Sequence, residues 1–155
     1  MKTKISLMVF LSILVGITSC QPTNDTSILS ERESRLDFNQ TVEQLQTNAA
    51  HLGYVVPIVH DMQANMLKAG VEVAPAKIIE LCHGGRAQEI LASDNDRFNM
   101  AMLPCRVAVY EKDDGLTYIS WTNYDQFSQL EHGVSLSVFR LVASDYEEII
   151  TPLLK

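Results

Sequence analysis

The sequence predicts an α+β domain in which an antiparallel sheet is covered by helices on one face. Three observations favour this class. Short runs rich in β-branched and aromatic residues recur along the chain, as is typical of strands. Segments with apolar residues at helical spacing lie between them. The links are short and include the Asp-Gly signal of a hairpin at residues 114–115, and hairpins connect antiparallel strands.

The first predicted elements are a short strand over residues 34–36 and a helix that begins after Asp37. Asp37 is a favourable cap, and Gln40 is placed to reach back to it. Apolar residues then recur at helical spacing as far as Gly53, which ends the helix; they are Val42, Leu45, Ala49 and Leu52.

The next stretch predicts two strands around a short helix. Residues 54–59 (YVVPIV) favour a strand, and Pro57 indicates a sheet edge or a bulge because proline has no N–H to donate. Asp61 is suited to cap a helix over residues 62–69. Residues 77–81 are apolar enough for a buried strand.

The second half of the chain contains a hairpin between helices. We expect a helix over residues 86–92, strands over 106–111 and 116–122, a loop or loose helix over 126–133, and a final helix that ends before Pro152. The predicted order is β-α-β-(α)-β-(α)-β-β-α, which favours an antiparallel sheet with helices on one side.

The N-terminus has the layout of an export signal. Lys2 and Lys4 precede an apolar run over residues 5–17, which is too short for a comfortable membrane span. Small residues directly before Cys20 resemble a bacterial lipobox. By that resemblance residues 1–19 are a lipoprotein signal peptide and the Cys20 sulfur carries a diacylglycerol; an ordinary signal peptide is the alternative.

Residues 20–33 are polar and predict a flexible tether, which leaves residues 34–155 for one domain. Gln21, rather than Asp, follows the cysteine. By the sorting habit of two-membrane bacteria, we expect the chain in the cell envelope, lipid-anchored at the periplasmic face of the outer membrane. Two acyl chains meet the usual requirement for stable anchoring.

The charge of the exported chain excludes one class of partner. Without Lys2 and Lys4, ten basic residues stand against 19 acidic ones, a net charge of −9. The basic residues are scattered singly, whereas phosphate contacts need clustered Lys and Arg. We therefore expect no nucleic-acid partner, and membrane contact through the lipid at Cys20 alone.

Two cysteines remain in the domain, Cys82 at the exit of one predicted strand and Cys105 at the entry of another. If these strands are antiparallel neighbours, both cysteines and His83 lie at one rim of the sheet. Three states are open for the pair: a structural disulfide, a redox-active or metal-binding thiol site, or two inert core side chains. No Cys-x-x-Cys is present, so the signature of a thioredoxin-like mechanism is missing.

Positive neighbours favour a reactive thiol. Arg106 directly follows Cys105, and Arg86 lies one helical turn beyond Cys82; such neighbours lower a thiol pKa. For a metal, Cys82, His83 and Cys105 would suit copper or zinc by ligand type, although their spacing matches no known metal pattern.

Secondary candidates are His60, Asp61 and Asn123. A histidine oriented by a carboxylate can act in chemistry or ligate a metal. For His60 and Asp61, however, the favoured interpretation is a strand end followed by a helix cap. In a simple meander His60 lies away from Cys82, unless a dimer partner supplies it. The open sheet edge near Pro57 makes a homodimer plausible.

Four parts of the sequence resemble the DUF302 domain family, in its subgroup with a cysteine in each of two motifs. They are LGYVVPIVHDMQ, IIELCHGG, MLPCRVAVYEKDDGLTYIS and Asn123, and the similarity spans residues 38–153. The resemblance implies a TATA-binding-protein-like β-α-β(4)-α fold and no established activity. The family usually has proline where this chain has Gly84, which loosens the turn that proline would fix.

These observations favour a lipid-anchored binding domain with a Cys82/Cys105 thiol site for redox or soft-metal chemistry. Two alternatives stay open. One is an enzyme of thiol or sulfur chemistry with Cys82 or Cys105 as nucleophile. The other is a structural or interaction module in which the two cysteines form a disulfide. The sequence does not decide whether the protein is an enzyme.

Overall fold

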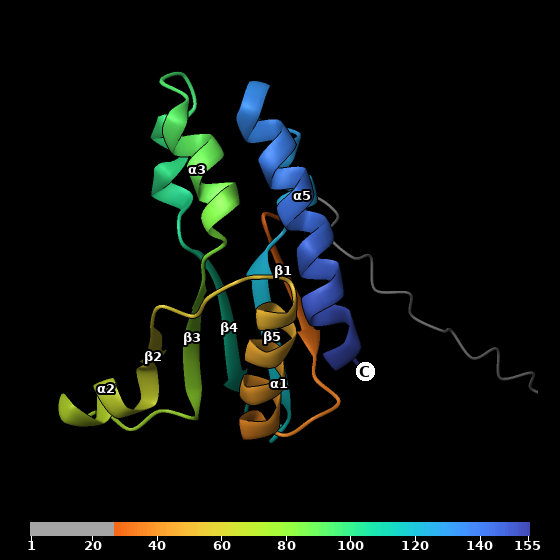
Figure 1. Cartoon of the computed structure of the whole chain (residues 1–155). Coiled ribbons are helices and arrows are strands. Elements are labelled where there is room, and N and C mark those ends of the chain that lie inside the picture. Colours follow the sequence, from red (N-terminus) through yellow and green to blue (C-terminus); the bar gives the residue numbers. More distant parts are fainter. Residues whose placement is uncertain (1–26) are drawn as a thin grey trace, which may run out of the picture.

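The structure, a computed structural model, describes residues 27–155 (Figure 1). The predicted signal peptide, Cys20 and residues 20–26 of the predicted tether lie outside these residues. Within the described chain, no helix combines the length and apolar character needed to cross a membrane.

The centre of the domain is a five-stranded sheet in which every pair of neighbours is antiparallel. In spatial order the strands are β1 (Leu29–Glu33), β5 (Thr117–Thr122), β4 (Cys105–Glu111), β3 (Ala76–Leu81) and β2 (Val59–Asp61). This arrangement confirms the predicted α+β class.

Two long helices, α1 (Phe38–His51) and α5 (Gly133–Ile150), lie side by side on one face of the sheet (Figure 1). Shorter helices connect the strands: α2 (Met62–Lys68), α3 (Gly84–Ala92) and α4 (Tyr124–Ser128). Two 3-10 turns, Arg97–Met102 and Thr151–Leu153, complete the described chain.

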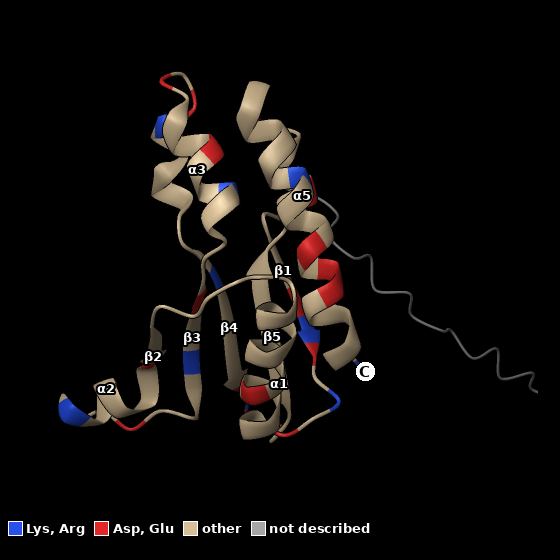
Figure 2. Ribbon diagram, in the orientation of Figure 1, with Lys and Arg blue, Asp and Glu red and all other residues tan. Residues whose placement is uncertain are grey.

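The core lies between the sheet and these two helices. Alternate residues of the central strands point toward it, and Ile79, Val107 and Ile119 are fully buried there. The helices supply the facing layer, with Leu45 from α1 and Phe139 from α5. Figure 2 shows that Lys and Arg are spread over separate elements, whereas several acidic residues follow one another on α5.

The predicted tether was wrong for its last five residues. Residues 29–33 form β1, which pairs along its whole length with β5, from Leu29 opposite Thr122 to Glu33 opposite Tyr118. The predicted strand over residues 34–36 is therefore displaced, and only Ser34 makes an isolated bridge, to Leu154. The sequence LSERE lacks apolar alternation because the strand is held by its backbone ladder and buries no side chain.

The strand expected over residues 54–59 is also displaced. Val55 makes only an isolated bridge to Cys82, and the continuous strand β2 starts at Val59. Pro57, which has no N–H, lies between them and explains the interruption. Residues 126–133 were expected to form a loop or a loose helix. The first part of this segment is the end of α4, which stops at Ser128.

Candidate functional site

The two cysteines lie at the same end of the sheet. Leu81, the last residue of β3, pairs with Cys105, the first residue of β4. Cys82 follows directly and exchanges two backbone hydrogen bonds with Val55, each with an N···O distance of 2.9 Å. Both cysteines are free thiols, and both line one narrow cavity of about 10 Å³.

The two thiols differ in exposure. Cys105 is 4% exposed and belongs to the core, whereas Cys82 is half-buried. Burial raises the pKa of the Cys105 thiol, and the nearby hydroxyl of Tyr124 only partly opposes this. The sequence predicted that Arg106 would lower the pKa of the Cys105 thiol, but this pKa is raised. Cys105 is therefore a protonated thiol at neutral pH and a poor nucleophile.

Three tyrosines surround Cys105: Tyr54, Tyr124 and Tyr146. Burial is the main cause that raises the pKa of each of these tyrosines. The rings of Tyr124 and Tyr146 meet edge to face with centroids 5.2 Å apart. The buried hydroxyl of Tyr146 has no hydrogen-bond partner in residues 27–155. Cys105 thus lies in an aromatic cage, formed by these three tyrosines, that contains an unsatisfied polar atom.

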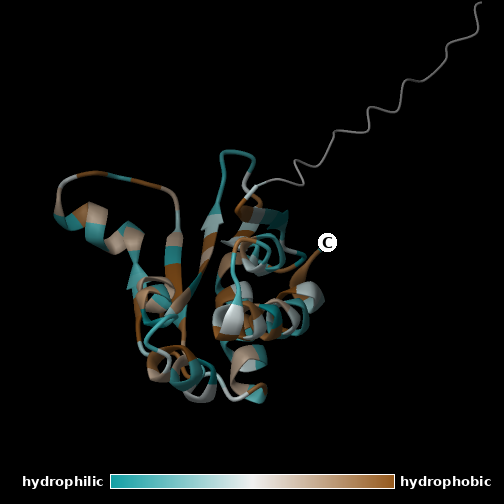
Figure 3. Ribbon diagram, turned by 90° about the horizontal axis from the view of Figure 1, so that it is seen from above, coloured by the Kyte–Doolittle hydropathy of each residue, from teal (hydrophilic) through white to brown (hydrophobic). Residues whose placement is uncertain are grey.

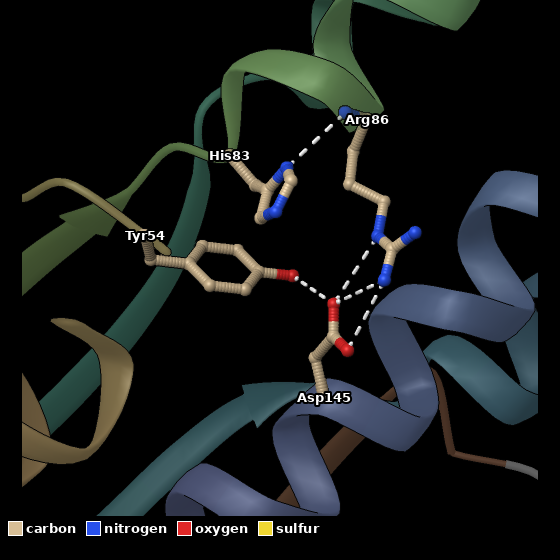
Figure 4. A network of polar contacts seen from close by, with 4 residues as sticks. All are labelled: Tyr54, His83, Arg86 and Asp145. Atoms are coloured by element: carbon tan, nitrogen blue, oxygen red, sulfur yellow. Dashed lines mark hydrogen bonds and ion pairs between the residues drawn. The ribbon is translucent and has the colours of Figure 1, made fainter. Parts of the chain in front are cut away.

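A polar network joins this cage to α3 and α5 (Figure 4). The Tyr54 hydroxyl donates to Asp145 Oδ2 at 2.8 Å. Arg86 donates to the same carboxylate through Nε at 3.2 Å and Nη2 at 3.1 Å. Arg86 was expected to favour a thiolate, but its charge is paired with Asp145, a residue that the sequence did not single out.

His83 is the cap of α3, and this role occupies its ring. Its Nδ1 accepts the backbone N–H of Arg86 at 3.3 Å, which assigns the ring proton to Nε2. The ring lies edge to face against Tyr54, with centroids 5.1 Å apart. Neither ring nitrogen of neutral His83 then has a free lone pair for a metal.

The predicted metal site receives no support from the geometry. Within residues 27–155, no group of three or more His, Cys, Asp or Glu side chains is arranged to hold a metal ion. Cys82, His83 and Cys105 share one end of the sheet without forming such a group, so copper or zinc at these residues stays a prediction.

Arg106 and His60 belong to a second cluster, centred on Glu80. His60 Nε2 lies 3.0 Å from Glu80 Oε1, and Arg106 Nη2 lies 3.4 Å from the same oxygen. The hydrogen bond with His60, together with the Arg106 charge, holds the pKa of Glu80 below its usual value despite burial. Arg106 is therefore a partner of Glu80, which the sequence analysis missed.

Asp61 and Asn123, two further candidates, are helix caps. Asp61 Oδ1 accepts the N–H of Ala64 at 2.8 Å at the start of α2, and Asn123 Oδ1 accepts the N–H of Gln126 at 3.1 Å at the start of α4. These contacts agree with the favoured interpretation of Asp61.

A larger cavity, of about 590 Å³, opens between β1, β5, α4 and α5. This volume lies within the usual range for small-molecule sites. Its lining includes Trp121, the only tryptophan of the chain, with Arg32 and Arg140. Tyr124 and Tyr146 also line it, so the cage around Cys105 borders this cavity. The sequence analysis missed the cavity because one of its walls is β1.

Comparisons with known proteins identify a family but no activity. The family described as "Domain of unknown function DUF302" matches residues 30–153. A similar solved structure is that of an uncharacterized conserved DUF302 protein from Bacillus stearothermophilus. It shares 16% identity and a TM-score of 0.71, over 81% of this chain and 98% of that one, so the likeness concerns the fold. No curated protein matches the sequence.

Proposed function

Because the chain belongs to the DUF302 family, whose activity is unknown, we propose from its own residues that it is a binding domain with a redox-responsive thiol site at Cys82 and Cys105. Cys82 is the thiol that reacts. Cys105 is its protonated neighbour and forms part of the domain's core.

The observation that carries this proposal is the difference between two free thiols at one end of the sheet. Cys82 is half-buried, at the point where β3 ends and α3 begins. Cys105 is buried in the aromatic cage and has a raised pKa. Because oxidation of cysteine follows exposure and thiolate character, it should be selective for Cys82.

The reaction we propose is exchange with a small disulfide. The Cys82 thiol loses its proton to water, and the thiolate attacks one sulfur of the reagent. The S–S bond of the reagent breaks, a mixed disulfide forms at Cys82, and the other half leaves as a thiolate that takes up a proton. Cys82 is oxidised and the reagent is reduced. Excess thiol reverses the exchange.

Glutathione disulfide is a suitable probe. Intact-mass measurement should find one adduct on the wild type and on Cys105→Ala, no adduct on Cys82→Ser, and loss of the adduct with dithiothreitol. An unchanged mass after long incubation contradicts the proposal. If Cys82→Ser still forms the adduct, the reactive thiol is a different cysteine.

Further measurements on the same cysteine variants separate the alternatives. A Cys82–Cys105 disulfide that resists reduction and leaves binding unchanged would favour the structural module. Turnover of a sulfur substrate that is lost in Cys82→Ser, without unfolding, would favour an enzyme. Cuprous or zinc ions that bind the wild type tightly, and neither single cysteine variant, would favour the soft-metal site.

The 590 Å³ cavity suggests where a second molecule binds. Its mixed lining, with Trp121, Arg32 and Arg140 beside Asp125 and Glu147, suits a small polar molecule with a flat apolar part. Since the chain has one tryptophan, intrinsic fluorescence reports directly on this cavity. Small aromatic carboxylates should shift Trp121 emission, and Arg140→Ala should weaken the effect.

The location follows from the predicted lipid at Cys20. We propose that the domain is held at the periplasmic face of the outer membrane by this anchor. The chain has three cysteines, so protein extracted from membranes, reduced and denatured should titrate two thiols if the Cys20 sulfur carries a diacylglycerol. Three titratable thiols would contradict the anchor.

A further inference from the structure

One part of the molecule leaves many of its apolar side chains in solvent. Seven of the fifteen exposed large apolar residues of the described chain lie within residues 55–73, and Val55 and Leu67 are 62% and 60% exposed. We call residues 55–75 the β2–α2 arm. Figure 3 shows the arm standing away from the helices that cover the sheet, with hydrophobic residues along it.

Helix α2 contacts its own subunit at β3 and is only partly covered there. It is seven residues long and contains no buried residue. Helices of this length are unstable in water unless an apolar face is packed against something. Asp61 caps its start, but a cap contributes only about 1 kcal/mol. Met66 and Leu67 therefore need a surface to cover them.

The arm also carries a free sheet edge. β2 is the last strand in the order β1-β5-β4-β3-β2 and pairs only with β3 in the described chain. Open edges are templates for pairing with another strand. When two copies of one edge strand meet across a two-fold axis, they run antiparallel, so the same edge can satisfy both copies.

The charge of the arm fits a second copy better than a charged partner. The exported chain is strongly acidic overall, which opposes association through most of its surface. Within the arm, Lys68 and Glu72 have opposite signs, and Asp61 is paired with Lys77 at 3.8 Å. The arm is thus close to neutral, and its contact with an identical arm is not opposed by repulsion.

We propose that the β2–α2 arm is the interface of a two-fold symmetric homodimer. The β2 edges of the two subunits lie side by side, and the apolar side chains of each arm cover those of the other. Large apolar patches of this kind mark interaction sites in soluble domains. In a symmetric contact both subunits contribute the same arm, so the apolar side chains of both arms leave solvent together.

The test uses the full chain in mild detergent, with the protein mass measured by light scattering across a range of concentrations. The wild type should have twice the chain mass. Leu67→Glu places a charge in the apolar contact and should shift the chain to a monomer. The dissociation constant of the dimer should rise at least tenfold. Leu130→Glu is the matched control, because Leu130 is 69% exposed and lies outside the arm.

A monomeric wild type at every concentration contradicts the proposal, whether lipid or another protein covers the arm in the cell. A dimer that survives Leu67→Glu, or one that Leu130→Glu disrupts as strongly, also contradicts it. If Leu67→Glu fails to fold by circular dichroism, Val71→Lys repeats the test in the loop after α2, where Val71 is 49% exposed.

Discussion

Tyr54 and Tyr146 are buried to a similar degree, at 4% and 2% exposed, but their hydroxyls differ in what they contact. The Tyr54 hydroxyl donates to the carboxylate of Asp145, whereas the Tyr146 hydroxyl has no partner in the described chain. Removing a hydrogen-bonded hydroxyl leaves a charged acceptor without its donor, but removing an unsatisfied one relieves a desolvation cost.

We therefore predict opposite results for two substitutions of the same kind. Tyr54→Phe should lower the free energy of unfolding by about 1.5–3 kcal/mol, the usual value for a hydrogen bond to a charged group. Tyr146→Phe should be neutral or stabilising. Urea titration followed by circular dichroism measures both. Equal destabilisation by the two variants would show that Tyr146 does have a partner.

The carboxylate of Glu80 makes the stability of the fold depend on pH. The pKa of Glu80 is held below its ordinary value of 4.5, first by the hydrogen bond with His60 and also by the Arg106 charge. A depressed carboxyl pKa stabilises the fold at pH values above 4.5, and this contribution is lost as the pH falls through the lowered pKa.

Glu80→Gln should therefore lower the melting temperature at pH 7, and the difference from the wild type should shrink as the pH falls below 4.5. Differential scanning calorimetry across this range measures the effect. Glu148→Gln, a substitution on the exposed surface of α5, is the control that should follow the wild type throughout. A difference that grows on acidification would have the wrong sign.

The sequence predicted the helices and strands that bury one face, because burial leaves a regular pattern of apolar residues. α1 and α5 carry apolar stripes, and the β4–β5 hairpin alternates around an Asp-Gly turn. β1 could not be found in this way, because LSERE buries no side chain and its backbone ladder is formed with β5. Its partner lies some ninety residues away in the sequence, so local patterns contain no trace of it.

Gly84 is the first residue of α3, where the resemblance to the family led us to expect proline. A proline there would be compatible with the local backbone. His83, the preceding residue, is extended with φ −107° and ψ 109°, as residues before proline prefer. A Cβ at Gly84 meets nothing within 4 Å, and proline is favoured at the first position of a helix.

Gly84→Pro should accordingly raise the free energy of unfolding by about 0.4–1 kcal/mol, mainly by restricting the unfolded chain. Thermal and urea unfolding of the variant test this. Gly85→Ala is a useful contrast, because its Cβ would lie 3.3 Å from the His83 ring and should gain less. Destabilisation by Gly84→Pro would mean that the helix start differs from the one described.

At the scale of the whole molecule, the candidate site was predicted only as far as strand order allows. Adjacent antiparallel strands bring Cys82 and Cys105 to one end of the sheet, as expected if β3 and β4 are neighbours. The residues that decide the chemistry there come from elsewhere. Asp145 and Tyr146 lie on α5 and Tyr124 starts α4, and no spacing rule links them to Cys105.

These long-range partners changed the expected chemistry. Arg86 and Arg106, the two cations next to the cysteines in the sequence, are paired with Asp145 and Glu80. Cys105 lies among tyrosines, and burial raises its pKa. Charge proximity along the chain therefore overestimated the reactivity of Cys105, and exposure now distinguishes it from Cys82.

Site-resolved alkylation of the native, reduced chain tests this central claim most directly. After a short exposure to iodoacetamide near pH 7.5, mass spectrometry of the digested protein should find the label on Cys82 and almost none on Cys105; after unfolding in urea, both should be labelled equally. Labelling of Cys105 in the native chain as fast as Cys82, or protection of both, would contradict the account.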